Sequence, residues 1–128
     1  MPKRMGRVLG ASVAAALVVA LALPASAATQ AKVTGGACSG ASTWTLTLKW
    51  DAGRIESDME VQTPAAGQVW TAGFKDNGVA FGHSSKTTLA DGSWSATRFA
   101  PNQAGTDAIT VHSKNTVTGE VCNASGTF

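Results

Sequence analysis

Two histidines are the side chains of this sequence best suited to acid-base or ligand chemistry near neutral pH. The alternation around His83 places it on the same strand face as Trp70 and Phe74, at the edge of an apolar surface. His83 is therefore a candidate binding residue, and a hydrogen-bonded histidine at the margin of the core is the simpler alternative. His112 falls on the polar face of its strand, where we expect it to be solvated.

Three carboxylates, Glu56, Asp58 and Glu60, project from one face of a single predicted strand. Alternate positions along a strand lie about 6.6 Å apart, whereas calcium needs oxygen ligands that converge on it at about 2.4 Å. We therefore expect no metal and no cofactor here. A solvated acidic face that discourages edge pairing is the expected role, and the acid of a small secreted enzyme is the alternative.

Tryptophans offer flat aromatic surfaces that stack on sugar rings or anchor protein partners. Trp44, Trp50 and Trp70 fall on apolar strand faces, so we expect them in the core. Trp94 differs because the other residues on its face are small or polar. It is the aromatic residue to test for exposure and, with His83, the candidate binding residue.

Cys38 and Cys122 lie near the two ends of the chain that follows the leader segment. An even pair in an exported protein is most simply a disulfide. Neither cysteine has a neighbouring histidine or a CxxC partner, and a zinc site would need four ligands at close spacing. The bridge should restrict the unfolded chain by roughly 4 to 5 kcal/mol.

The first 27 residues have the three-part layout of a secretory signal peptide. Basic residues at 1–7 precede an apolar run over 8–23, and Pro24 then leads to Ala25-Ser26-Ala27. We expect cleavage after Ala27, and cleavage after Ala28 also fits the small-residue rule. The apolar run is short for a membrane span. The mature protein is therefore expected to be secreted and extracellular.

The chain has 128 residues, of which 44% are hydrophobic and 14% charged, so it has room for one ordinary domain. The formal net charge of +2 depends on Lys3, Arg4 and Arg7, and seven basic and eight acidic residues remain beyond them. Such a balance excludes nucleic acid as the default partner, because phosphate binding needs an excess of basic side chains. It likewise excludes a polybasic membrane surface.

Alternation with a period of two is the dominant pattern of the mature sequence, and no helical period follows the leader. It predicts an all-β, two-sheet antiparallel sandwich of the immunoglobulin-like kind, with a small barrel as the alternative. The domain should span 38–128, after an N-terminal segment at 28–37. About seven strands are expected, over Thr43–Trp50, Arg54–Gln62, Gln68–Lys75, Val79–Lys86, Ser93–Phe99, Ala108–Lys114 and Glu120–Asn123.

Asn77-Gly78 is the pair best suited to a two-residue type I′ hairpin turn, because both positions take positive φ angles. Pairing Asp76 with Val79 then sets the register of the two flanking strands. This register predicts three cross-strand pairs on one face: Phe74–Phe81, Ala72–His83 and Trp70–Ser85.

Four stretches of the sequence resemble a group of small secreted actinobacterial proteins of undescribed function. They are Cys38-Ser39-Gly40-Ala41-Ser42-Thr43-Trp44, Asp51-Ala52-Gly53-Arg54-Ile55-Glu56, Gly67-Gln68-Val69-Trp70 and Thr118-Gly119-Glu120-Val121-Cys122. The resemblance implies export, the terminal disulfide and a β-sandwich. It supplies no catalytic residues.

Two classes of function are open at this stage. The first is a secreted, non-enzymatic module that binds an extracellular protein, a cell-wall glycan or a small ligand, a class that includes sandwiches holding an apolar molecule between their sheets. The second is a small secreted enzyme with a site near His83 or on the Glu56/Asp58/Glu60 face. A pocket with His83 beside a carboxylate would favour the enzyme, and a flat aromatic patch with Trp94 would favour binding.

Overall fold

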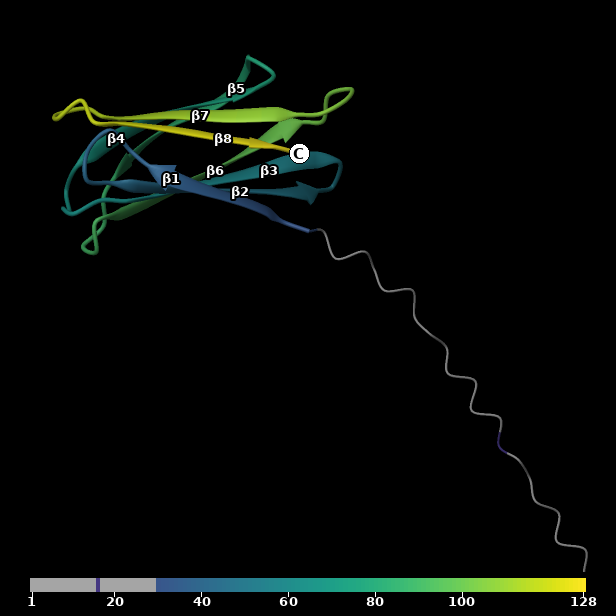
Figure 1. Ribbon diagram of the computed structural model, residues 1–128, viewed down its shortest axis with the longest axis horizontal. Helices are drawn as coiled ribbons and strands as arrows, with labels where there is room; N and C mark the ends of the chain where they lie inside the picture. The colour runs from purple at the N-terminus through teal and green to yellow at the C-terminus, as the bar shows by residue number, and fades with distance from the viewer. Residues whose placement is uncertain (1–15, 17–29) are drawn as a thin grey trace, which may run out of the picture.

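The computed structural model describes Ala16 and residues 30–128. Apart from Ala16, the expected signal peptide and its cleavage site lie outside the described residues. The described chain forms two antiparallel sheets of four strands each, packed face to face (Figure 1). The strands are β1 (Lys32–Ala37), β2 (Thr43–Asp51), β3 (Arg54–Gln62), β4 (Val69–Asp76), β5 (Val79–Thr87), β6 (Ser93–Pro101), β7 (Ala108–Asn115) and β8 (Val121–Thr127).

The two sheets have the strand orders β1-β2-β3-β6 and β5-β4-β7-β8. After the meander β1-β2-β3, the chain crosses to form the hairpin β4-β5, and then β6 returns beside β3. Strand β7 crosses again to lie beside β4. This is Greek-key connectivity. The expected all-β, two-sheet antiparallel sandwich is confirmed.

Strand β1 is an eighth strand that the alternation pattern did not predict. Its sequence, Lys-Val-Thr-Gly-Gly-Ala, carries little apolar surface, and nearly all of it is exposed. It adds to the edge of β2 by backbone pairing, so that the sandwich begins at Lys32 rather than at Cys38. Gly36 leaves room for the indole of Trp44, which a Cβ at this position would approach to 2.9 Å.

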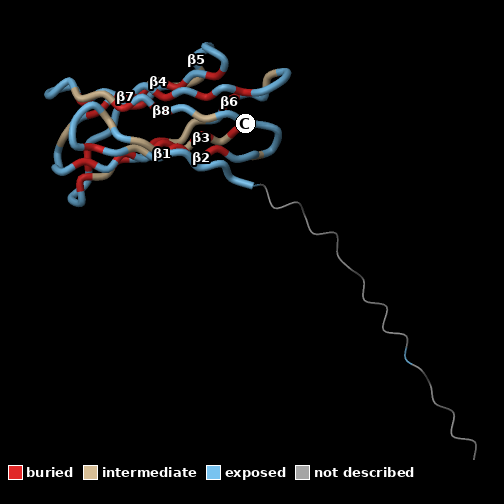
Figure 2. The backbone as a smooth tube through the Cα atoms, in the orientation of Figure 1, coloured by how far each residue is buried: buried red, intermediate tan, exposed pale blue. Residues whose placement is uncertain are grey.

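The hydrophobic core lies between the two sheets, where the buried residues of both layers face each other (Figure 2). Burial alternates along most strands, as the sequence predicts; in β7 every second residue is buried. The largest fully buried apolar side chains are Trp70, Phe74, Leu46, Leu48, Ile55, Met59, Ile109, Val61 and Val111.

The tryptophans are only partly where the sequence pattern puts them. Trp94, the residue expected to be exposed, is only 2% exposed and packs against Trp70 with 6.1 Å between ring centroids. The two rings come from opposite sheets, since Trp70 lies on β4 and Trp94 on β6. Trp50, expected in the core, is 42% exposed because it lies at the end of β2, where it meets the ring of Phe128 edge-on.

The Asn77-Gly78 turn has the expected positive φ angles, 48° and 82°, and Asp76 pairs with Val79 as predicted. The register predicted beyond the Lys75–Ala80 pair is wrong, because a β-bulge between Phe74 and Lys75 shifts the pairing and leaves Phe81 without a direct partner. The observed pairs are Phe74–Gly82, Gly73–His83, Ala72–Ser84 and Trp70–Lys86.

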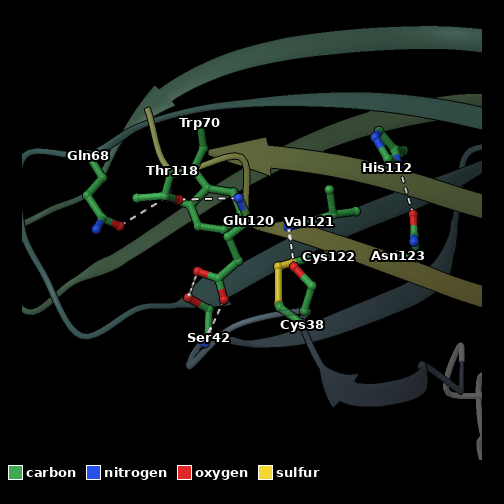
Figure 3. Close-up of a disulfide and its surroundings, with 11 residues drawn as sticks. Cys38, Ser42, Gln68, Trp70, His112, Thr118, Glu120, Val121, Cys122 and Asn123 are labelled. Atoms are coloured by element: carbon green, nitrogen blue, oxygen red, sulfur yellow. Dashed lines mark hydrogen bonds between the residues drawn. A yellow bond between two sulfur atoms is a disulfide. The ribbon is translucent and has the colours of Figure 1, made fainter. Parts of the chain in front are cut away.

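The expected disulfide joins Cys38 to Cys122, which are separated by 84 positions in sequence (Figure 3). Polar contacts beside the bridge reinforce it. Both the backbone N–H and the hydroxyl of Ser42 donate to the Glu120 carboxylate, at 3.0 and 2.8 Å. The backbone N–H of Val121 donates to the hydroxyl oxygen of Ser39 at 2.9 Å. The chain before β2 is thus fastened to the start of β8.

Candidate functional site

A groove of about 980 Å³ lies on the outer face of the β5-β4-β7-β8 sheet and is lined by residues from all four strands. Its volume is at the upper end of the range that holds small molecules. The lining residues are Thr71, Ala72, Gly73, Phe74, Lys75, Ala80, Gly82, His83, Thr110, Val111, His112, Asn123, Ala124 and Ser125.

Gly73 forms the floor at the centre of this groove. It pairs with His83 of β5 on one side and with His112 of β7 on the other, so the three residues form one row across the sheet. A Cβ at Gly73 would meet no atom within 4 Å, and the backbone φ is not positive. Neither the backbone conformation at position 73 nor contacts with neighbouring atoms therefore require a glycine there. A glycine inside a strand weakens it and often marks a place that a ligand approaches closely.

His83 lies on the outer face of the sheet and is exposed, which corrects the expectation that it shares a face with Trp70 and Phe74. The bulge in β5 is the cause, since it moves every residue beyond it to the opposite face. Arg98 of β6 fixes this edge, because its Nε and Nη2 donate to the backbone oxygen of His83 at 3.1 and 2.8 Å.

His112 is exposed, as expected, but its ring is held in place (Figure 3). Its Nδ1 lies 2.7 Å from Oδ1 of Asn123, the next residue in the row. An amide oxygen can only accept, so Nδ1 of His112 carries the proton and donates it. The other ring nitrogen, Nε2, lies on the side of the ring away from Asn123 (Figure 3).

The polar lining of the groove consists of Lys75, the two histidines, Asn123 and hydroxyl groups, with no carboxylate among the described residues that line it. Sequence analysis did not find this combination. The two histidines are distant in sequence and were assigned to unrelated faces. The mid-strand glycine between them was the signal that could have marked the site.

The acidic strand face lies elsewhere. Glu56, Asp58 and Glu60 project from β3 on the outer face of the opposite sheet, so the structure does not bring them near His83. The Glu56 carboxylate lies 3.5 Å from Nζ of Lys49. The hydroxyl of Thr97 donates to Asp58 at 3.2 Å. These contacts are those of a polar sheet surface.

A buried pair of carboxylates, Asp76 and Asp107, lies at the end of the sandwich where β4 ends and β7 begins, and each residue is 1% exposed. Neither carboxylate oxygen of Asp76 accepts a hydrogen bond from a described residue. Burial, a proton shared with Asp107 and the charge of Asp107 raise the pKa of Asp76 to about 6. Sequence analysis missed this pair because Asp76 adjoins the Asn77-Gly78 turn, where a polar residue is expected.

In comparisons with known proteins, the chain matches no protein-family model, and no curated protein is similar enough in sequence to count as a relative. Within the described part of the chain, no helix has the length and hydropathy needed to cross a membrane.

Proposed function

We propose that this protein is a secreted, non-enzymatic binding module whose small extracellular ligand occupies the groove above Gly73. The groove itself carries the proposal: about 980 Å³ is hollowed out of a sheet face that could have been covered by side chains. A protein partner or a cell-wall glycan is a weaker match. A flat aromatic patch that includes Trp94 would favour such a partner, and Trp94 is buried.

The chemistry of the lining supports binding over catalysis. A histidine that acts as a base is commonly oriented by a third group such as a carboxylate, and the described lining residues include no carboxylate. The acidic residues of the alternative enzyme, Glu56 and Glu60, lie on the opposite sheet. Lys75, the histidines and the hydroxyl groups instead suit a ligand that carries hydrogen-bond acceptors or negative charge.

Two observations support the extracellular location. The disulfide between Cys38 and Cys122 belongs to the oxidising conditions outside the cytosol. The leader sequence up to Ala27 has the composition of a signal peptide.

The proposal is tested by filling the groove. Gly73→Leu should fold, since open space surrounds the added side chain, and it should lose the ligand. Native mass spectrometry of protein recovered from culture medium measures the mass of any molecule retained by the wild type and by the variant.

Thr45→Leu is the matched control, because Thr45 is exposed on the outer face of the other sheet. A retained molecule that is lost only in Gly73→Leu supports the proposal. Equal retention by both variants would place the ligand outside the groove.

A further inference from the structure

We propose that His83 and His112 together bind one divalent transition-metal ion of the kind that prefers imidazole ligands, such as Cu²⁺ or Zn²⁺, directly above Gly73. The inference rests on the groove being a binding site and names the chemistry at its floor. It also reverses the expectation from the sequence that no metal is bound. That expectation followed from the spacing of the carboxylates on one strand and from the lack of closely spaced zinc ligands in the sequence.

The first argument is the register. His83 and His112 are both paired with Gly73, one on each side, and both side chains rise from the same face. Neighbouring antiparallel Cα atoms lie about 4.5 or 5.5 Å apart, which puts the two histidine Cα atoms about 10 Å apart. Two imidazoles at this spacing can lean toward each other and meet an ion midway, with metal–nitrogen bonds of about 2.0 to 2.1 Å.

The second argument is the empty space where the ion would lie. The row His83–Gly73–His112 lacks a side chain only at its centre, and a Cβ there would meet nothing within 4 Å. Any larger residue would stand between the rings. A glycine within a strand lowers the stability of that strand. We explain Gly73 in the middle of β4 by the space that it leaves between the two histidine rings.

The third argument is the orientation of the His112 ring. Nδ1 donates to Asn123 at 2.7 Å, which leaves Nε2, on the side of the ring away from Asn123, as the nitrogen available to an ion (Figure 3). Histidines that bind metals almost always donate their other ring N–H to a nearby oxygen in this way. Asn123 is thus a positioning residue for the proposed site.

The surroundings select the kind of ion. Calcium and magnesium need oxygen ligands, usually carboxylates, and none is present among the described residues that line the groove. Lys75 borders the groove and Lys114 projects from the same face, which disfavours an ion held by charge alone. Imidazole nitrogens bind copper, zinc and nickel through directed lone pairs.

The pair supplies two ligands and leaves the other coordination positions open. No group of three or more histidine, cysteine or acidic side chains is placed to hold a metal among the described residues. Water or a donor atom of the proposed organic ligand would fill the remaining positions. An open position is what distinguishes a metal that binds ligands from a purely structural one.

Cu²⁺ is the probe of choice because it is bound most tightly by nitrogen ligands among the divalent first-row metals. The experiment is calorimetric titration of the purified protein with Cu²⁺ at pH 7.5, followed by electron paramagnetic resonance of the complex. We expect one ion per chain and hyperfine splitting from two imidazole nitrogens. The sequence contains only two histidines, so the assignment of those nitrogens is unambiguous.

Three variants test the geometry. His83→Ala and His112→Ala should each weaken Cu²⁺ binding at least about tenfold, by analogy with the effect of lesser changes around metal sites. The third combines His83→Ala with Ser85→His, which keeps the number of histidines but moves one of them a row along β5, opposite Thr71. It should bind no better than His83→Ala. Circular dichroism checks that each variant folds.

Unchanged affinity in either alanine variant, or wild-type affinity when the histidine is moved, would overturn the inference. Its failure is distinguishable from that of the proposed function. If the histidine variants leave Cu²⁺ binding intact while Gly73→Leu still loses the retained molecule, only the metal site is refuted. If Cu²⁺ binding depends on both histidines but Gly73→Leu retains its ligand, the groove function is refuted and the metal site stands.

Discussion

Replacing Asp76 with asparagine should abolish the pH dependence that this residue imposes on folding stability. Asp76 and Asp107 are each 1% exposed, and burial together with the neighbouring carboxyl raises the pKa of Asp76 from 3.8 to about 6. Between these two values the folded protein holds a proton that the unfolded chain releases. The stabilising contribution of Asp76 is therefore fully present below pH 3.8 and is lost as the pH rises through about 6.

The size of the effect follows from the shift. From 3.8 to about 6 is roughly two pK units, and each unit corresponds to about 1.4 kcal/mol of differential stability. Ionised Asp76 should therefore cost the folded state about 3 kcal/mol at pH 7 relative to acid conditions. Asparagine is neutral at every pH, so Asp76→Asn should gain about 3 kcal/mol over the wild type between pH 4 and pH 7. For a domain of this size that is about 10 °C or more in melting temperature.

The assay is urea unfolding of the wild type and Asp76→Asn at pH 4, 5, 6 and 7, with the disulfide intact. Because the two proteins are compared at each pH, the titration of carboxyl groups that do not interact with Asp76 cancels. Asp91→Asn is the control with the opposite sign. The N–H and hydroxyl of Ser93 donate to Asp91 at 3.0 and 2.7 Å and lower its pKa, so that variant should lose stability relative to the wild type as the pH rises.

A constant difference between wild type and Asp76→Asn across this range would refute the reasoning. It would mean that Asp76 has the same affinity for protons in the folded and unfolded chain. The buried location of its carboxyl group would then carry no energetic cost, against the general penalty for burying an unpaired charge.

Three further predictions follow from the fold. Trp94→Ala should destabilise the domain by about 3 to 5 kcal/mol in chemical denaturation, since it removes a buried indole; a loss under 1 kcal/mol would contradict its core position. Reduction of Cys38–Cys122 should lower the melting temperature measured by circular dichroism, and an unchanged value would argue against the entropic role of the bridge. Gly78→Ala should lower the free energy of unfolding in urea by about 1 to 2 kcal/mol, because the φ of Gly78 is 82°. The control Gly73→Ala should lose no stability. Equal effects of the two substitutions would contradict strain in the turn.

The architecture was predictable because each strand carries its own signal. Alternation along Ala108–Asn115 or Arg54–Gln62 reflects one face turned to the core, and that information is local. The disulfide was predictable because the sequence contains only two cysteines and both follow a segment predicted to be a signal peptide. Strand β1 was not predictable from alternation, since it is held by backbone pairing to β2 and buries almost no side chain.

Trp94 shows where the local signal ends. Its own face is small and polar in sequence, which suggests an unburied strand. In the structure Trp94 is buried, and Trp70, which comes from the other sheet, packs against it with 6.1 Å between ring centroids. Packing across the two layers depends on residues distant in sequence, and no pattern within one strand contains it.

The candidate site failed to emerge from the sequence for a related reason. A single extra residue in β5, Phe81, forms the bulge and turns His83 from the core face to the outer face. On the outer face, His83 lies in the same row as Gly73 and His112. His112 belongs to β7, which the Greek-key crossing places beside β4. The turn chemistry of Asn77-Gly78 is compatible with either register. What favours the observed one is contact with another strand: Gly82 gives the Arg98 side chain room that a Cβ would take, at 2.9 Å, and that side chain then binds the backbone oxygen of His83.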